Sequence, residues 1–456
     1  MSVNLVSSVV VRHSRQAESP FSIPRTKELY PKRIPKVRRL DNGLRVIVEE
    51  MPGRNLASLR IVVGAGSVDE TTDGAAHLTE HMVFNGTRNR SGKQIRKESE
   101  IAGTRINAHT KPLTTGFESD TLAENILVPL ELVIDMIFNH TLERFGHEKD
   151  IVVNELRRSK NGHEEGCPHC HLRKFSESLW NSHPIFKDPI GTDESISSIR
   201  RDEIESFLER LYTPDNVVIS VAGKCKEREI LKKVQGLTKG VKGEMKKLPL
   251  PPFLYTRDVH AGKSKRATIT TLNIACDAPS EEDKAAMCKT CIVVNAIGPR
   301  LWQKLRGAKG IAAYDAGASY YPNPLGGQIF LATGVDDEKS ISAAEIILKE
   351  VENVKSRGIS PLEFLCLSQD LRTHTLGNFD FCTFRAEMNA EEVLDHGEFI
   401  PLSEMWSSVS EVDNKRIMEH ANELFAKEGL SLIAVGGKKL PNESEFGKLI
   451  DTNARF

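Results

Sequence analysis

The feature that most limits how this chain can fold is an internal repeat of helix and strand patterns. An amphipathic helix followed by a strand, Ile204–Gly223, recurs as Ile417–Gly437, so the numbering shifts by 213 at the start (417 − 204) and by 214 at the end (437 − 223). The stretch Leu132–Leu156 likewise resembles Ala344–Leu371 in helix, break and second helix. Any two halves that mix helices and strands look somewhat alike, but the constant offset favours a duplicated α+β domain of roughly 210 residues.

A stretch rich in lysine, glycine and proline, Gly236–Pro252, separates the two repeats and is typical of a linker between domains. Runs of β-branched residues bounded by turn signals predict strands at Leu44–Glu49, Leu59–Val63 and Val217–Ala222. We expect an N-terminal extension, a first domain, a linker and a second domain, with the bounds 1–34, 35–235, 236–254 and 255–456.

The composition is that of a folded protein without a strong overall charge. Of the 456 residues, 39% are hydrophobic and 27% are charged, with 62 basic against 63 acidic side chains. These values exclude disordered and fibrous classes, and the charge balance gives no general attraction to nucleic acid or to anionic membranes. We find no apolar run of the roughly 18 residues that a membrane span needs.

The cysteines predict no disulfide framework, because there are only eight in a chain of this length. A reducing compartment fits them best. Two Cys-x-x-Cys pairs, Cys167/Cys170 and Cys288/Cys291, lie too far apart to form one structural zinc site, so we interpret them as ordinary thiols.

The N-terminal residues have the composition of an organelle transit segment. Residues 1–17 contain Arg12, His13 and Arg15, four serines and no acidic side chain before Glu18. The alternative is a frayed tail that carries no targeting signal.

The motif with the clearest chemistry is His77-Leu78-Thr79-Glu80-His81. Asp73 is a plausible N-cap for a helix that ends near Asn85-Gly86. Residues four apart lie on one face of a helix, so His77 and His81 can bind a single ion, and Glu80 lies beside that face. Imidazoles suit zinc, and a catalytic zinc site keeps one position open.

A third ligand has to come from elsewhere in the chain, because two histidines do not hold catalytic zinc alone. The segment Glu148–Glu155 offers two carboxylates seven residues apart, which is about two helical turns and therefore one face. We predict Glu155 as the third ligand and Glu148 as a carboxylate that steadies a ligand or the catalytic water. In the second repeat the position of Glu155 falls on Asp370.

Together with this spacing, the sequence His77–Thr87 (HLTEHMVFNGT) resembles the signature of the pitrilysin/insulinase family of metallopeptidases. The resemblance continues in Ile106–Thr110, in His183–Gly191 and in Pro299–Gly310 of the second half. It implies two duplicated domains, each a mostly antiparallel sheet packed with helices, that together form one half of a clamshell. The first domain is then the catalytic, zinc-binding one.

The resemblance also implies roles for single residues. One zinc ion per chain is held by His77, His81 and Glu155, while Glu80 acts as the general base with Glu148 in support. Asn107 and Ala108 belong to a strand that pairs with the substrate backbone. Acidic side chains that hold basic substrate groups are expected at Glu164 and Glu165, although the usual companion acid is His169 here. The family's substrate-contacting Arg and Tyr correspond to Arg306 and, one residue late, Tyr314.

Within the family, the two-domain layout resembles the processing-peptidase branch, whose members remove positively charged presequences from imported proteins in the mitochondrial matrix or a related organelle. The partner subunit in that branch carries a glycine-rich loop, and nothing like it occurs between Asn295 and Gly310. This chain therefore resembles the catalytic subunit, with a non-catalytic α-type subunit as an expected partner. Two alternatives remain: a general oligopeptide-degrading peptidase of the same family, and a non-catalytic core subunit of a respiratory complex.

Overall fold

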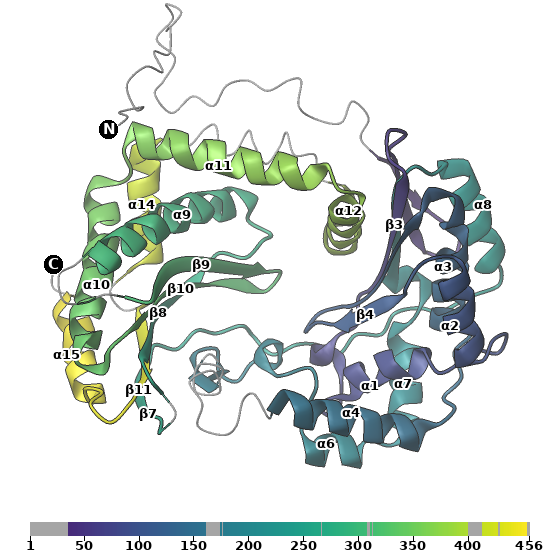
Figure 1. The fold of residues 1–456 in the computed structure, drawn as a ribbon, viewed down its shortest axis with the longest axis horizontal. Helices are drawn as coiled ribbons and strands as arrows, with labels where there is room; N and C mark the ends of the chain where they lie inside the picture. Colours follow the sequence, from purple (N-terminus) through teal and green to yellow (C-terminus); the bar gives the residue numbers. More distant parts are fainter. Residues whose placement is uncertain are drawn as a thin grey trace, which may run out of the picture.

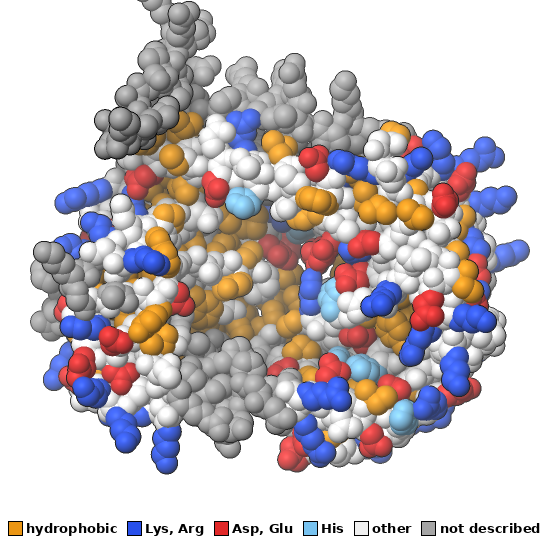
Figure 2. Space-filling view, in the orientation of Figure 1, with side chains coloured by type: hydrophobic (Ala, Val, Ile, Leu, Met, Phe, Trp, Pro, Cys, Tyr) orange, Lys and Arg blue, Asp and Glu red, His pale blue; other side chains and the backbone are white. Residues whose placement is uncertain are grey.

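The computed structural model describes residues 35–160, 174–175, 177–265, 267–307, 311, 313–399, 413–426 and 429–453. Two mixed β-sheets, each packed with helices, lie on opposite sides of the molecule (Figure 1). The space-filling view shows the molecule hollowed between these two halves (Figure 2).

The first sheet has the strand order β1-β2-β6-β3-β5-β4. Its strands are β1 (Val37–Arg39), β2 (Arg45–Glu50), β3 (Leu56–Val63), β4 (Asn107–Thr110), β5 (Thr115–Leu122) and β6 (Val217–Gly223). β2 and β6 run parallel and the other neighbours are antiparallel. All seven residues of β6 are buried, as expected for an apolar strand covered on both faces, whereas β4 is a short edge strand.

The second sheet repeats this topology in the order β7-β11-β8-β10-β9. Its strands are β7 (Val259–Lys263), β8 (Thr270–Ala278), β9 (Asp315–Asn323), β10 (Gly326–Val335) and β11 (Ser431–Gly436). β7 and β11 form its parallel pair, as β2 and β6 do in the first sheet. The offset between the starts of β2 and β7 is 214 (259 − 45), and the offset between the starts of β6 and β11 is the same (431 − 217). The predicted duplicated α+β fold is confirmed.

Helices cover both sheets, and most present apolar residues at helical spacing. In α3, for example, Leu130, Val133 and Ile137 are buried at spacings of three and four residues. The helices of the first half are α1 (Ala75–Val83), α2 (Gly92–Ile101), α3 (Leu127–Phe138), α4 (Phe145–Lys160), α6 (Asp193–Ser198), α7 (Arg201–Leu211) and α8 (Glu227–Leu237). Those of the second half are α9 (Lys284–Gly307), α10 (Ser340–Arg357), α11 (Pro361–Phe379), α12 (Cys382–His396), α14 (Asn414–Leu424) and α15 (Glu443–Asn453). Short 3-10 turns lie at Ser67–Asp69, Ala123–Asn125, Pro184–Phe186, Pro214–Asn216 and Asp337–Lys339.

In each half, a segment of the chain packs on the sheet of the other half. Helix α12, which follows α11 in the second half, crosses to the first sheet, where Ala390 and Val393 pack against Ile47, Val62 and Val218 (Figure 1). In return, side chains that precede the linker pack on the second sheet: Phe175, Leu179 and Trp180 contact Ala275, Ile433 and Val435. Each sheet therefore has part of one face covered by the other half of the chain.

The packing of α12 on the first sheet can be compared with the predicted division into domains. Residues 238–258, all of them described, form no helix or strand between α8 and β7. Helix α12 lies within 255–456, the predicted second domain, and packs on the first sheet, while the domain bounds themselves stay a prediction. Among the described residues, no helix is long and apolar enough to cross a membrane.

Candidate active site

Helix α1 carries the histidine motif, and its N-terminus is held by Glu70. The Glu70 carboxylate accepts hydrogen bonds from the backbone N–H groups of Gly74 (3.0 Å) and Ala76 (2.9 Å). The prediction that Asp73 is the N-cap is wrong, because Gly74 occupies the cap position with φ of 93°. The Asp73 carboxylate instead accepts a hydrogen bond from Lys187 Nζ at 2.8 Å. A φ of this value favours glycine, which explains why the helix begins one residue later than Asp73 suggested.

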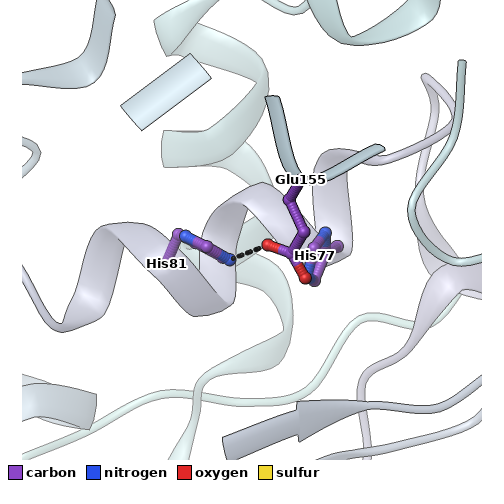
Figure 3. Close-up of side chains that lie close together, drawn as sticks. All are labelled: His77, His81 and Glu155. Carbon is purple, nitrogen blue, oxygen red and sulfur yellow. Dashed lines mark ion pairs between the residues drawn. The ribbon is translucent and has the colours of Figure 1, made fainter. Parts of the chain in front are cut away.

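The structure brings the three predicted ligands together (Figure 3). The rings of His77 and His81, one turn apart on α1, have centroids 4.9 Å apart. Glu155 reaches them from α4, with its Oε2 atom 3.4 Å from His81 Nε2. One ligand atom from each of the three residues lies within 4.8 Å of the others, and no other such group of three occurs in the described chain.

The chemistry of these side chains fits a zinc ion. Two imidazoles and one carboxylate, with room for a further ligand, form the donor set of a catalytic zinc site. His77 Nδ1 is buried and has no hydrogen-bond partner among the described residues. Burial, together with the neighbouring His81, lowers the pKa of His77 to about 4. The ring is therefore neutral at pH 7, which is the form that binds a metal.

Glu148 lies on the far side of His81 from Glu155. Its Oε2 atom is 3.6 Å from His81 Nδ1, and its side chain is buried. A carboxylate beside the second nitrogen of a metal-binding imidazole fixes the orientation of the ring and raises its basicity. Glu148 is thus close enough to His81 for the supporting role, which stays a prediction.

Glu80 is a buried carboxylate beside the three ligands. Its exposed fraction is 9%, and burial raises the pKa of its carboxyl group. Thr110, the last residue of β4, donates a hydrogen bond from Oγ1 to Glu80 Oε2 at 2.6 Å. A carboxylate at this position beside the three ligands can accept a proton and return it as a general base does.

These groups line a cavity of about 690 Å³ in the first half of the molecule. One wall is β4, where the predicted substrate-binding residues Asn107 and Ala108 lie. Among the described strands β4 pairs only with β5, so its other edge has no partner strand in this part of the chain and could pair with an extended peptide. Asp188, Pro189 and Ile190 form another part of the lining that the site prediction did not include.

Among the described site residues, Arg306 and Tyr314 do not line this cavity. Arg306 lies in the last turn of α9 in the second half, where its guanidinium lies over the Trp302 ring at 4.7 Å, and the Tyr314 side chain is exposed. Glu164, Glu165, His169 and the pair Cys167/Cys170 lie outside the described residues.

The second repeat has a cavity of about 300 Å³ between α9 and α11, where the first repeat has its histidines and Glu155. At the offset of the repeat, Cys291 replaces His77 (291 − 77 = 214) and Asn295 replaces His81 (295 − 81 = 214). Asp370, at an offset larger by one residue (370 − 155 = 215), takes the place of Glu155, and all three residues line the cavity. Burial raises the pKa of Cys291 to about 11, so its thiol is protonated at neutral pH and is a poor ligand.

Acidic side chains gather where β4 meets α12. Lys111, directly after β4, forms an ion pair with Glu391 of α12 at 2.7 Å, and the charges of Glu387 and Asp395 lie nearby. Burial and the charge of Asp395 raise the pKa of Glu281 to about 7. Figure 2 shows acidic side chains around the hollow between the two halves.

Family models match the chain over both repeats. The insulinase model (peptidase family M16) matches residues 45–188, and the model for the peptidase M16 inactive domain matches residues 198–365. A zinc protease of Rickettsia bellii, described as uncharacterized, is 25% identical over 417 residues, which cover 87% of this chain and 96% of that protein. The mitochondrial-processing peptidase subunit beta of Saccharomyces cerevisiae is 25% identical over 431 residues, with 89% and 92% covered.

A solved structure, the crystal structure of a protease from Helicobacter pylori, shares the fold with a TM-score of 0.78 at 18% identity, covering 89% of this chain and 100% of that chain. The expected closeness to the processing-peptidase subunit is not supported, because the bacterial protein is equally similar. The two matched models and the grouping of His77, His81 and Glu155 both indicate a peptidase with a metal site in its first half. The chain belongs to the M16 insulinase family of zinc peptidases.

Proposed function

We propose that this protein is a zinc metalloendopeptidase that cuts extended, positively charged peptides. The observation that carries the proposal is the arrangement of His77, His81 and Glu155 around one point, with Glu80 beside them and the free edge of β4 forming the wall. Hydrolysis of a peptide bond needs a polarised carbonyl, an activated water and a proton for the leaving amine.

The residues of the chain can divide these tasks. Zinc bound by His77, His81 and Glu155 would supply a positive charge that polarises the scissile carbonyl and makes water more acidic. The Glu80 carboxylate would take the proton from the attacking water and then pass it to the leaving amine. The edge of β4 would hold the peptide backbone in an extended conformation by strand pairing.

A group of acidic side chains near Lys111, the residue that follows β4, supports a preference for basic peptides. Glu387, Glu391 and Asp395 lie near Lys111, which forms an ion pair with Glu391, and Glu281 lies near Asp395 and Glu391. Lys284 is a second basic side chain beside Glu281 and Asp395, so acidic groups outnumber basic ones here. An acidic wall attracts arginine and lysine side chains and disfavours acidic peptides. We therefore propose the N-terminal presequences of imported organellar proteins as substrates, and a mitochondrion or related organelle as the location.

A second candidate is a general oligopeptidase of the same family. It is favoured by the equal similarity to the bacterial zinc protease. Such an enzyme would cut peptides without regard to arginine, so the rates on basic and neutral peptides separate the two candidates.

The test is cleavage of a fluorescence-quenched presequence peptide by the purified, zinc-loaded chain, beside a peptide in which every arginine is replaced by glutamine. We expect faster cleavage of the presequence, loss of activity with a chelator, and loss of activity with retained zinc in Glu80→Gln. His77→Ala should lose both zinc and activity. Glu124→Gln, at an exposed position away from the cavity, is the matched control and should be unchanged.

Other outcomes overturn parts of the proposal. Equal rates on the two peptides would replace presequence processing with general peptide degradation. If a folded, zinc-loaded chain cuts neither peptide, the assay is repeated with an added α-type subunit that carries a glycine-rich loop. Cleavage that appears only then would show that the partner is required. No cleavage with the partner present would favour the non-catalytic core subunit.

A further inference from the structure

We propose that Thr110 is a positioning residue for the general base Glu80. This inference rests on the proposed function, because it assigns a role within the same site. The hydroxyl of Thr110 fixes the rotation of the Glu80 carboxylate and couples it to β4, the strand that would hold the substrate.

The contact between the two side chains is short and has no substitute. Thr110 Oγ1 donates to Glu80 Oε2 at 2.6 Å, which is the length of a hydrogen bond to an ionised acceptor. Among the described residues, Thr110 is the one group recorded as donating a hydrogen bond to this carboxylate. Without Thr110 the carboxylate loses the contact that selects its orientation.

The backbone on both sides of Thr110 is held firmly. Thr110 pairs with Thr115 of β5, and the next residue, Lys111, donates its N–H to Thr114 O at 2.8 Å. The turn also accepts hydrogen bonds from the 3-10 turn Ser67–Asp69, with Val68 N 2.9 Å from Pro112 O. A Cβ on Gly66, the residue before that 3-10 turn, would lie 2.3 Å from Pro112 O, so the two loops pack in direct contact.

The arrangement leaves one oxygen of Glu80 for chemistry. Oε2 accepts from Thr110, whereas no described residue donates a hydrogen bond to Oε1. Oε1 is therefore available to accept the proton of a water molecule. Because β4 would position both the peptide backbone and, through Thr110, the base, one strand sets the distance between the proton acceptor and the scissile bond.

The test compares Thr110→Val, which keeps the shape but removes the hydroxyl, with Thr110→Ser, which keeps the hydroxyl. Thr121→Val is the matched control, because Thr121 is a threonine of β5 in the same hairpin whose hydroxyl donates to Ala102 O at 3.1 Å, away from the cavity. Activity is measured on a neutral peptide as well as on the presequence, so that the result does not depend on substrate preference. Zinc content and crystal structures are determined for all three variants.

For Thr110→Val we expect kcat to fall about tenfold or more, with KM and zinc content close to those of the wild type. Thr110→Ser should recover most of the rate, and Thr121→Val should keep it. The crystal structure of Thr110→Val should show the Glu80 carboxylate rotated or in two orientations. An unchanged kcat, an equal loss in Thr110→Ser, or an unchanged carboxylate would overturn the inference.

The two proposals fail in different ways. If the wild-type chain cuts neither peptide, with or without a partner, the proposed function fails, and the crystal structures alone decide whether Thr110 orients Glu80. If the wild type is active and Thr110→Val is equally active, the peptidase proposal stands and the role of Thr110 is refuted.

Discussion

Two carboxylates flank His81, and each lies beside a different nitrogen of the ring. Glu155 Oε2 is 3.4 Å from Nε2, on the side of the other ligands, while Glu148 Oε2 is 3.6 Å from Nδ1. The side chain of Glu148 is buried and that of Glu155 is half exposed toward the cavity. The ring is therefore held from behind by a residue that does not itself join the group of three ligands.

Glu148→Gln should weaken zinc binding by about 10- to 100-fold, because a neutral amide supports the imidazole less well than a carboxylate. Competition with a chelator of known zinc affinity measures the change. The control is Asp150→Asn, an exposed acid on the same helix that does not line the cavity. An unchanged zinc affinity in Glu148→Gln would mean that this carboxylate has no part in orienting His81.

At the scale of elements, the helix that carries both histidines depends on a carboxylate that precedes it by several residues. Glu70 accepts from two of the N–H groups at the start of α1, those of Gly74 and Ala76. Asp73, which is closer in sequence, instead forms an exposed ion pair with Lys187. Loss of the Glu70 contacts would leave N–H groups at the buried start of this helix without an acceptor.

Glu70→Ala should lower the free energy of unfolding by about 1–2 kcal/mol, the typical effect of losing an N-cap. Asp73→Ala should change it by less than about 0.5 kcal/mol, because an exposed ion pair contributes little. Urea unfolding of the zinc-free proteins gives both values. If Asp73→Ala were the more harmful of the two, the cap would be the one that the sequence suggested.

The sequence predicted what depends on local spacing. The period of the α-helix places His77 and His81 on one face of α1. In the same way, the spacing of two turns places Glu148 and Glu155 on one face of α4. The contact between Thr110 and Glu80 was not predicted, because it joins a strand to a helix that lies far from it in sequence. The positive φ of Gly74 likewise could not be predicted from hydrophobic periodicity. For this reason α1 begins one residue later than the predicted cap Asp73 implied.

For the molecule as a whole, buried polar contacts fix α12 on the first sheet. Arg385 of α12 forms an ion pair with Glu49 of β2 at 3.0 Å, and Asn389 donates to the same carboxylate at 3.1 Å. Arg45 donates to Val393 O at 2.9 Å. The helix therefore has one register against the sheet, and its attachment ties the two halves together.

Arg385→Ala should destabilise the protein by about 3–5 kcal/mol, because Glu49 would stay buried without its partner. Lys415→Ala, which removes an exposed pair with Glu419, is the control and should have almost no effect. The measurement is urea unfolding followed by tryptophan fluorescence and circular dichroism. Similar stabilities of the two variants would show that α12 is held by apolar packing alone.

The contact region between the halves should also respond to pH. Burial and nearby Asp395 raise the pKa of Glu281 from 4.5 to about 7, so the folded protein keeps this proton to higher pH than the unfolded chain does. This contribution to stability is complete below pH 4.5 and is lost as the pH rises through about 7.

Glu281→Gln imitates the protonated form, so it should be more stable than the wild type at pH 8 by about 1 kcal/mol, after allowance for solvent screening. Near pH 4 the two proteins should have equal stability. Urea unfolding across this pH range tests the difference, with Glu124→Gln as the control. A constant difference at every pH would exclude titration of Glu281 as the cause.

The crossing of α12 has a consequence for the order in which a ribosome delivers this chain. The first half ends with α8 at Leu237, whereas α12 begins only at Cys382, well over a hundred positions later. At a translation rate of about 5–20 residues per second, α12 is synthesised roughly 7 to 30 seconds after the first half. During this time Ile47, Val62 and Val218 lack the helix that packs on them in the folded protein. Over that interval the emerging polypeptide offers an incomplete sheet to chaperones and to other nascent chains. The half that holds the histidines is thus finished only when translation of the other half is nearly complete.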